Sequence, residues 1–130
     1  MHILCGLLNN KPVFINGDGS TTRDFTFVEN AVEINIKAMC TENNDAFGKV
    51  YNVAVGESTS LNELFDYLQE ISSNHTPPQY REERPGDVKH SLADITLART
   101  LLNYDPKVKT REGLLKTYEW FSKTFKSVLT

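Results

Sequence analysis

The chain has only two cysteines among its 130 residues, which is too few for a disulfide framework. Cys5 and Cys40 are therefore expected to be free thiols, as in a reducing cytoplasm. No apolar run approaches the roughly 18 residues that a membrane-spanning helix needs. The first residues carry neither the basic region nor the small-residue cleavage site of a secretory signal, so the sequence predicts a cytoplasmic protein without a membrane partner.

Basic residues are also scarce. Lysine and arginine together number 14 against 17 acidic residues, which gives a net charge of −3 at pH 7. General nucleic-acid binders usually carry a basic excess, so we expect no nucleic-acid partner. The three histidines are scattered and lack the cysteine or carboxylate spacing of a metal site. Gly17-Asp18-Gly19 is not a phosphate loop, because no GxGxxG and no GKS/T follows it.

The composition is otherwise that of an ordinary soluble domain. Hydrophobic residues make up 39% of the chain and charged residues 24%. The length fits one domain, residues 1–130. Apolar runs and helical periodicities alternate along the chain, and this alternation favours an α/β fold. We expect strands over 13–16, 24–27 and 49–55, and helices over 3–9 and 28–41, from Ser60 through Ile71, over 94–102, and from Thr110 through Phe125.

Three helix starts and one helix end have local signals. Ser60-Leu61-Asn62-Glu63 is a capping box, in which the serine hydroxyl and the glutamate carboxylate each accept from a backbone amide at the helix start. Asp94 and Thr110 are predicted to be the N-caps of the last two helices. Asn103 suits the left-handed position that ends the helix after Asp94.

The helix over 28–41 carries apolar residues on an unusually wide surface. Val28, Val32 and Met39 share one face at helical spacing, whereas Ile34 and Ile36 point elsewhere. Such a surface predicts burial on more than one side. A domain of this length has difficulty covering two sides of one helix.

Two arginines are in settings that suggest anion binding. Arg23 lies between a glycine-rich turn and an apolar run, and Arg84 belongs to the rigid turn Arg-Pro-Gly-Asp that ends at Asp87. A pair of guanidinium groups suits a diphosphate, because each can hold two oxygens at once. Asp87 could accept a hydrogen bond from a ribose hydroxyl, as acidic residues do in nucleotide sites.

A simpler interpretation of the arginines stands beside this one. Arg23 would pair with Asp24 or another nearby acid, and Arg84 would belong to an exposed charge cluster with Glu82 and Glu83. No nucleophile is paired with a base, so the residues alone predict no catalytic site. They predict an α/β domain with a candidate anion site.

Four segments in this order carry a resemblance to a known family. They are INGDGSTTRDFTFVENAV, VYNVAVGESTSLNELF, RPGDVKHSLADITLARTLLNYDP and REGLLKTYEWF. The series resembles the C-terminal part of extended short-chain dehydrogenase/reductases (SDRs), and most of all their NAD-dependent nucleotide-sugar epimerases of the UDP-N-acetylglucosamine 4-epimerase type. In that family NAD removes a hydride from C4 of a UDP-sugar and returns it.

The resemblance implies a UDP-sugar partner and assigns roles to five residues. The arginines that hold the two phosphates in the family match Arg23 and Arg84. The aspartate that contacts the ribose matches Asp87, and the strand that supplies uracil contacts points to Phe14 and Asn16. The implied fold is the C-terminal portion of a Rossmann-type extended SDR, with short strands and about four to five helices.

The chain departs from the family in what it lacks. The family's N-terminal half carries the glycine-rich dinucleotide turn and the catalytic Tyr-x-x-x-Lys pair, and no tyrosine here has a lysine four residues later. The resemblance therefore implies a substrate-binding fragment that is inactive alone. NAD would be the cofactor of the parent enzyme and is not expected to bind this chain alone.

In the family, the helix matching residues 28–41 packs against the cofactor-binding part. Exposed here, it would leave an apolar patch, which predicts association or a homo-oligomer. Three alternatives remain open: another enzyme of the family, such as a dehydratase, a decarboxylase or a glucose-type 4-epimerase; a non-catalytic nucleotide-binding or interaction domain; and a plain structural domain with surface arginines.

Overall fold

The computed structural model describes residues 2–126 and, within them, the side chains of residues 3–124. Five α-helices, one 3-10 helix and four short strands are found there. In chain order they are α1 (His2–Leu8), β1 (Phe14–Asn16), β2 (Thr22–Arg23), α2 (Val28–Met39), η1 (Asn44–Ala46), β3 (Thr59–Ser60), α3 (Leu61–Ser72), β4 (Gln79–Arg81), α4 (Thr96–Leu102) and α5 (Thr110–Lys126). The expected α/β fragment with short strands and four to five helices is confirmed.

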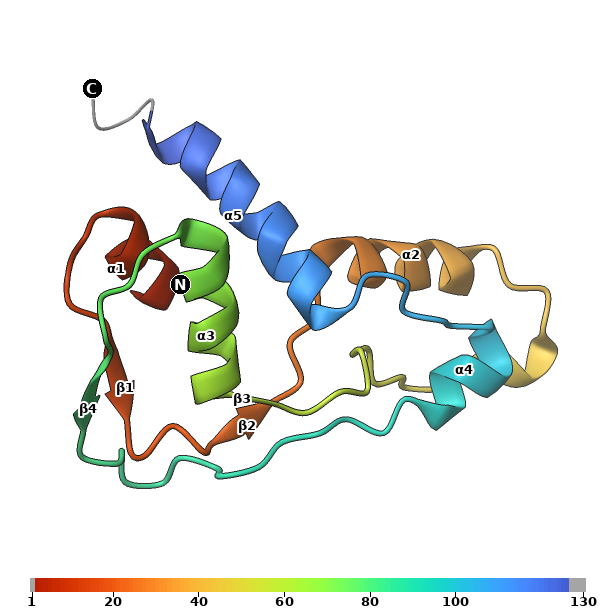
Figure 1. Cartoon of the computed structure of the whole chain (residues 1–130). Coiled ribbons are helices and arrows are strands. Elements are labelled where there is room, and N and C mark those ends of the chain that lie inside the picture. Colours follow the sequence, from red (N-terminus) through yellow and green to blue (C-terminus); the bar gives the residue numbers. More distant parts are fainter. Residues whose placement is uncertain (1, 127–130) are drawn as a thin grey trace.

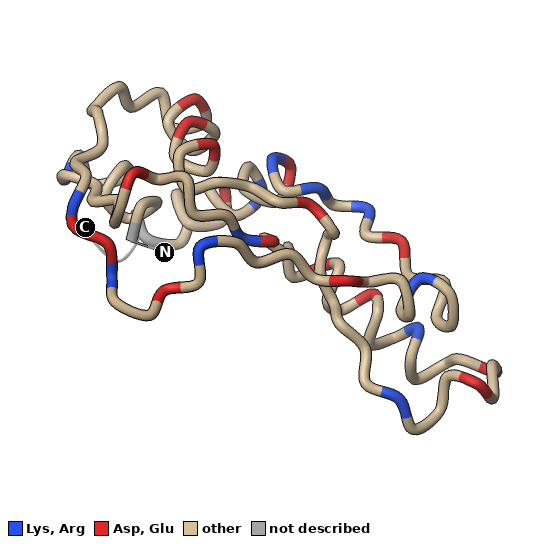
Figure 2. The backbone as a smooth tube through the Cα atoms, turned by 90° about the horizontal axis from the view of Figure 1, so that it is seen from below, with Lys and Arg blue, Asp and Glu red and all other residues tan. Residues whose placement is uncertain are grey.

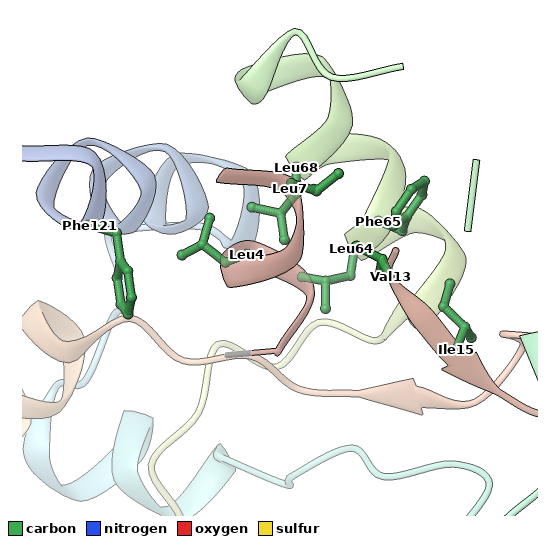
Figure 3. Packing of buried hydrophobic residues seen from close by; sticks show 8 residues of the cluster. All are labelled: Leu4, Leu7, Val13, Ile15, Leu64, Phe65, Leu68 and Phe121. Atoms are coloured by element: carbon green, nitrogen blue, oxygen red, sulfur yellow. The ribbon is translucent and has the colours of Figure 1, made fainter. Parts of the chain in front are cut away.

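One end of the molecule is built on a parallel pair of strands, β1 and β4, in which Ile15 lies opposite Tyr80. Helices α1 and α3 lie against this pair, and α5 crosses beside them (Figure 1). The side chains between these elements form one apolar cluster, whose buried members are Leu4, Leu7, Val13, Ile15, Leu64, Phe65, Leu68 and Phe121 (Figure 3). Burial of this cluster stabilises this end of the fold.

The other end is formed by α2, η1 and α4 around a second cluster. Its buried members are Ile34, Ala46, Ala54, Ile95, Ala98, Leu102 and Tyr104. The Tyr104 hydroxyl donates a hydrogen bond of 2.9 Å to the Ala54 carbonyl, so the polar tip of this buried ring has a partner.

The two ends are joined by an antiparallel pair, β2 and β3, in which Arg23 lies opposite Thr59. The chain from Asp87 to Ser91 runs alongside β2, where the Thr22 amide donates to the Lys89 carbonyl at 2.8 Å (Figure 1). Thr22 also forms an isolated parallel bridge with His90. The segments that carry the candidate residues Arg23 and Asp87 are therefore neighbours between the two clusters.

Two of the expected strands are wrong. Residues 24–27 form no strand, and the ladder lies earlier, at Thr22–Arg23. Residues 49–55 form no strand, although their composition favours one. A strand needs a partner for its backbone groups, and here the Val55 amide is instead bound by the Asp24 carboxylate. The strand expected over 13–16 is confirmed as β1.

The capping box is confirmed. The Ser60 hydroxyl accepts from the Glu63 amide, and the Glu63 carboxylate accepts from the Ser60 amide. Asn103 ends α4 at φ 51° and ψ 37°, the left-handed conformation that was expected. The Asp94 carboxylate accepts from the Thr96 amide at 2.9 Å, although the N-cap residue of α4 is Ile95.

The cap predicted at Thr110 is wrong. Thr110 is the first residue of α5, and its buried hydroxyl has no hydrogen-bond partner among the described residues. The nearest amide in capping register, that of Gly113, donates instead to the Lys109 carbonyl at 2.9 Å. Because α5 already includes Thr110, this residue lies within the first turn and not at the position before it from which an N-cap side chain accepts.

Helix α2 buries one side and exposes the other. Asn30 and Ile34 are buried, whereas a stripe along the opposite side, made of Val28, Val32, Ile36 and Met39, is 51–77% exposed. We call these four residues the α2 stripe. The prediction of an apolar patch on this helix is confirmed. The expectation that Ile36 points away from Val28 and Val32 is wrong, because Ile36 lies one turn after Val32 on the exposed side, and the helix is buried on one side only. No helix in residues 2–126 has the length and hydropathy needed to cross a membrane.

Candidate functional site

Arg23 is held by hydrogen bonds on both sides of its guanidinium group. Its Nη1 donates to the Thr22 carbonyl at 2.8 Å, and its Nη2 donates to the Asp87 carboxylate at 2.7 Å. The side chain is 29% exposed, so it is anchored but reachable from solvent. The alternative in which Arg23 pairs with Asp24 is wrong, and the acid that it contacts is Asp87.

Arg84 and Asp87 stand at the two ends of one tight turn. The Asp87 amide donates to the Arg84 carbonyl at 3.2 Å, and Gly86 in between has φ of +81°, which favours glycine. The Arg84 side chain is exposed and makes no hydrogen bond or ion pair within the part of the chain that the structure describes. The Arg23–Asp87 contact therefore brings the Arg84 turn next to β2.

The geometry leaves Arg23 with unused donors. A guanidinium group has five N–H donors, and the two contacts above use two of them. The other three have no partner among residues 2–126. A bidentate contact to a phosphate needs two parallel N–H groups. Arg23 can therefore keep Asp87 and still bind an anion.

Phe14 and Asn16 lie on β1, and no hydrogen bond joins them to Arg23, Arg84 or Asp87 among the described residues. Backbone groups of residues 13 and 17 bond to β4: the Val13 carbonyl accepts from Gln79, and the Gly17 amide donates to Arg81, both at 2.8 Å. In a parallel ladder the backbone groups of alternate residues face opposite edges of the strand, so those of residues 14 and 16 point away from β4. The backbone N–H and C=O groups of Phe14 and Asn16 therefore face the free edge of β1.

The ring of Phe14 is already covered on one face. The Arg81 guanidinium carbon lies 3.2 Å from the ring centroid, a cation–π contact between the two strands. Phe14 remains 41% exposed. A nucleobase beside Phe14 would therefore meet the backbone groups at the free edge of β1 more readily than an uncovered face of the aromatic ring. Arg81 has no signal in the sequence, because its position opposite β1 depends on the pairing of β1 with β4.

The turn after β1 connects its edge to β2. The Asp18 carboxylate accepts from both the hydroxyl and the amide of Ser20, and these hydrogen bonds lower the pKa of Asp18. The Asn62 side chain donates to the Asp18 carbonyl and accepts from the Tyr80 hydroxyl. Asn62 was also missed, since an asparagine at the second position of a helix gives no signal of a long-range contact.

Charges of both signs are interspersed along the backbone (Figure 2). Among the described residues there is no group of three histidine, cysteine or acidic side chains that could hold a metal ion. An open groove of about 480 Å³ lies between α3 and the loop before β4 and is lined by Asn62, Phe65, Asp66, Gln69, His75, Pro77, Pro78 and Tyr80. None of the five predicted site residues lines it.

Known proteins are similar to the chain in both sequence and fold. The family model described as GDP-mannose 4,6 dehydratase matches residues 2–117. A UDP-glucose 4-epimerase of Mycolicibacterium smegmatis is 35% identical over 115 residues, which are 88% of this chain and 36% of that protein. A UDP-N-acetyl-alpha-D-glucosaminuronate decarboxylase of Bacillus cytotoxicus is 28% identical over 124 residues, 88% of this chain and 36% of that protein.

Solved structures agree with these relatives. The UDP-glucose 4-epimerase of Thermotoga maritima, solved with UDP-glucose, has a TM-score of 0.86 and 37% identity, covering 95% of this chain and 38% of that one. The UDP-N-acetylglucosamine 4-epimerase of Methanobrevibacter ruminantium, in complex with UDP-N-acetylmuramic acid, has a TM-score of 0.84 and 33% identity, covering 94% and 38%. A UDP-glucuronic acid 4-epimerase of Bacillus cereus, with UDP-glucuronic acid and NAD, has a TM-score of 0.86 and 32% identity, covering 94% and 38%.

The match over residues 2–117 settles the class: the chain belongs to the GDP-mannose 4,6 dehydratase family of extended SDRs. Its homologues are UDP-sugar 4-epimerases and related enzymes, decarboxylases among them. The chain spans a little over a third of the length of these relatives.

Proposed function

We propose that the chain is the UDP-sugar-binding portion of a nucleotide-sugar 4-epimerase, of the UDP-N-acetylglucosamine or UDP-glucose type. The observation that carries the proposal is the Arg23–Asp87 contact, because it brings together two segments 64 residues apart and leaves three N–H donors of Arg23 unused. In this proposal Arg23 and Arg84 hold the two phosphates, and we call this pair the diphosphate clamp. The Asp87 oxygen that does not contact Arg23 accepts from a ribose hydroxyl.

The free edge of β1 supports a base site next to the clamp. The Phe14 carbonyl and the Asn16 amide give an acceptor and a donor on the same edge, in the order set by the parallel ladder. Uracil presents a matching N3–H donor beside a carbonyl acceptor. In the proposal the base is recognised by backbone groups of Phe14 and Asn16, and the turn 17–20 connects it with Arg23.

A comparison of UDP with CDP tests the base site. Cytosine has an acceptor at N3 where uracil has a donor, so the Phe14 carbonyl would face a lone pair. We expect CDP to bind about tenfold more weakly than UDP, the cost of one lost hydrogen bond and one unpaired acceptor. Equal affinity for the two nucleotides would contradict recognition by this edge.

Catalysis and cofactor binding are assigned to the remaining part of such an enzyme. The 130 residues contain no Tyr-x-x-x-Lys pair and no glycine-rich dinucleotide turn. We therefore expect no conversion of UDP-N-acetylglucosamine when the purified chain is incubated with it and NAD. Turnover above background would contradict this assignment.

Association through the α2 stripe belongs to the same proposal. The stripe is a row of half-exposed apolar side chains along one helix, and such patches on soluble domains mark interaction surfaces. In the proposal it is covered in the working enzyme, and the isolated chain self-associates through it. A dehydratase or decarboxylase of the same family remains the second candidate, favoured by the decarboxylase among the relatives.

A further inference from the structure

Asp24, the residue after Arg23, binds backbone rather than a cation. Its Oδ1 accepts from the Val55 amide at 3.0 Å, and its Oδ2 accepts from the Gly56 amide at 3.0 Å. Two consecutive amides thus occupy both oxygens of one half-buried carboxylate. Hydrogen bonds from backbone N–H groups to a carboxylate are charge-assisted and are among the stronger ones in proteins.

The Val55–Gly56 amides belong to a segment that is itself fixed. Val55 is 1% exposed. Gly56 has φ of +75°, a conformation that favours glycine, and this turn presents two successive N–H groups to one carboxylate. The chain then leads directly into β3, whose Thr59 pairs with Arg23.

Arg23 is consequently anchored on both sides along the backbone. The β2–β3 ladder holds Thr22 and Arg23 opposite Ser60 and Thr59, and the Asp24 carboxylate ties the next residue to the start of the same returning segment. The Arg23 backbone is thus held by contacts at its own position and at the residues before and after it. The Arg23 guanidinium group donates to the Thr22 carbonyl and the Asp87 carboxylate.

The same two amides also keep Asp24 away from Arg23. An adjacent carboxylate with free oxygens would compete for the guanidinium group and reduce the number of donors left for an anion. The Asp24 carboxylate is directed to the Val55 and Gly56 amides and makes no hydrogen bond with Arg23, which keeps three unused N–H donors. The negative charge of Asp24 is thereby stabilised by backbone amides, without a contact to either arginine of the clamp.

We propose that Asp24 is a positioning residue for the diphosphate clamp: through the Val55–Gly56 amide pair it fixes the backbone of Arg23 and leaves the guanidinium group free for the ligand. This inference rests on the proposed function, since it takes the ligand of Arg23 to be a phosphate. Asp24 touches neither the ligand nor Asp87 in this account, and it acts only through Arg23.

The variant Asp24→Asn tests this role. The asparagine has the same shape but only one acceptor oxygen, so its NH₂ group meets one of the two amides donor to donor. We expect the affinity for UDP to fall about tenfold, as with the loss of an outer-shell partner at a metal site. The matched control Asp45→Asn removes one acidic charge at an exposed position and should leave the affinity unchanged.

A double-variant comparison separates positioning from a general structural effect. If Asp24 acts through Arg23, Asp24→Asn should change UDP affinity less than twofold when Arg23 is already alanine. An equal loss in the Arg23→Ala background would overturn the inference. Affinities in the weak-binding variants are measured by NMR titration with UDP.

A measurement without ligand keeps the inference testable if UDP does not bind at all. In ¹⁵N spectra of the free chain, the Arg23 Nη–H groups, which donate to Thr22 and Asp87, should give resolved signals that broaden or collapse to the solvent-exposed position in Asp24→Asn, with the Val55 and Gly56 amides shifted. An unchanged Arg23 signal would overturn the inference, whatever the nucleotide result. Failure of UDP to bind the wild-type chain with a perturbed Arg23 signal would instead count against the proposed function alone.

Discussion

Arg23 and Asp87 form an ion pair with 2.7 Å between Nη2 and Oδ1, although 64 residues separate them in the sequence. The pair is partly exposed, so its contribution to stability is small. Its consequence is geometric: it brings the turn that carries Arg84 alongside β2. The backbone turn of Arg84 is therefore near Arg23 without a ligand, and if the two arginines bind one diphosphate as proposed, this preorganisation lowers the cost of binding.

Arg23→Lys tests the need for a guanidinium group. Lysine keeps the positive charge but has a single nitrogen, which cannot donate to the Thr22 carbonyl, to Asp87 and to a phosphate in the same arrangement. We expect UDP affinity to fall roughly tenfold in calorimetric titration, the effect of losing one charge-assisted contact. Arg111→Lys, at an exposed arginine paired with Glu70, is the matched control and should bind UDP as the wild type does. Retained affinity in Arg23→Lys would mean that UDP binding needs only a positive charge at this position and not a guanidinium group.

The α2 stripe predicts self-association. Ile36 is 51% exposed in the middle of the stripe, so Ile36→Glu places a charge within the surface that we expect to be covered. Sedimentation velocity should show concentration-dependent association of the wild-type chain and less of it in the variant. Ala38→Glu adds the same charge to the same helix outside the stripe and should behave as the wild type. Association that persists in Ile36→Glu would contradict the prediction that the α2 stripe is the interface.

Asn30 is a buried polar anchor of α2. It is 1% exposed, donates to the Val108 carbonyl at 2.7 Å and accepts from the Val108 amide at 3.1 Å. Asn30→Ala leaves both backbone groups buried and unpaired, which we expect to lower the free energy of unfolding by about 3 kcal/mol. Asn35→Ala, an exposed asparagine of the same helix, should cost less than about 0.5 kcal/mol. Urea unfolding measures both, and equal costs would contradict this account.

Glu63 predicts a pH dependence of stability. Hydrogen bonds from the Ser60 amide and hydroxyl lower the pKa of Glu63 from its ordinary value of 4.5. A group whose pKa is lower in the folded state stabilises the fold above its unfolded pKa, and this stabilisation is lost as the pH falls through the folded pKa. Glu63→Gln should therefore be less stable than the wild type at pH 7, and the difference should shrink below pH 4.5.

Thermal unfolding between pH 3 and pH 7 measures the Glu63 effect. Glu42→Gln, which changes an exposed glutamate outside the capping box, should show no such pH-dependent difference. A difference between wild type and Glu63→Gln that stays constant over the whole range would contradict the assignment of the effect to Glu63 ionisation.

The features that could be predicted from the sequence are those set by neighbouring residues. The Ser60–Glu63 capping box and the left-handed Asn103 depend on contacts within a few positions, and both are found. Thr110 carries a similar local signal, yet α5 begins at Thr110 itself and its hydroxyl is unpaired among the described residues. A local cap signal is therefore reliable only where the helix begins just after the capping residue.

Features that depend on pairing across the chain could not be predicted. Residues 49–55 have the composition of a strand, but the Val55 amide is bound by Asp24 and no strand pairs with the segment. The Arg23–Asp87 contact and the Phe14–Arg81 stack likewise join segments whose proximity only the fold creates. The resemblance nominated Arg23 and Asp87 separately, and the structure adds that they touch.

Calorimetric titration of the purified chain with UDP shows whether Arg23 and Arg84 form a diphosphate site, with NAD as the control ligand and the Arg23→Ala, Arg84→Ala double variant alongside. We expect UDP to bind the wild-type chain, NAD not to bind it, and UDP binding to be lost in the folded double variant. A well-folded chain that binds no UDP, or a double variant that binds it as tightly as the wild type, would contradict the assignment of a diphosphate site to these arginines.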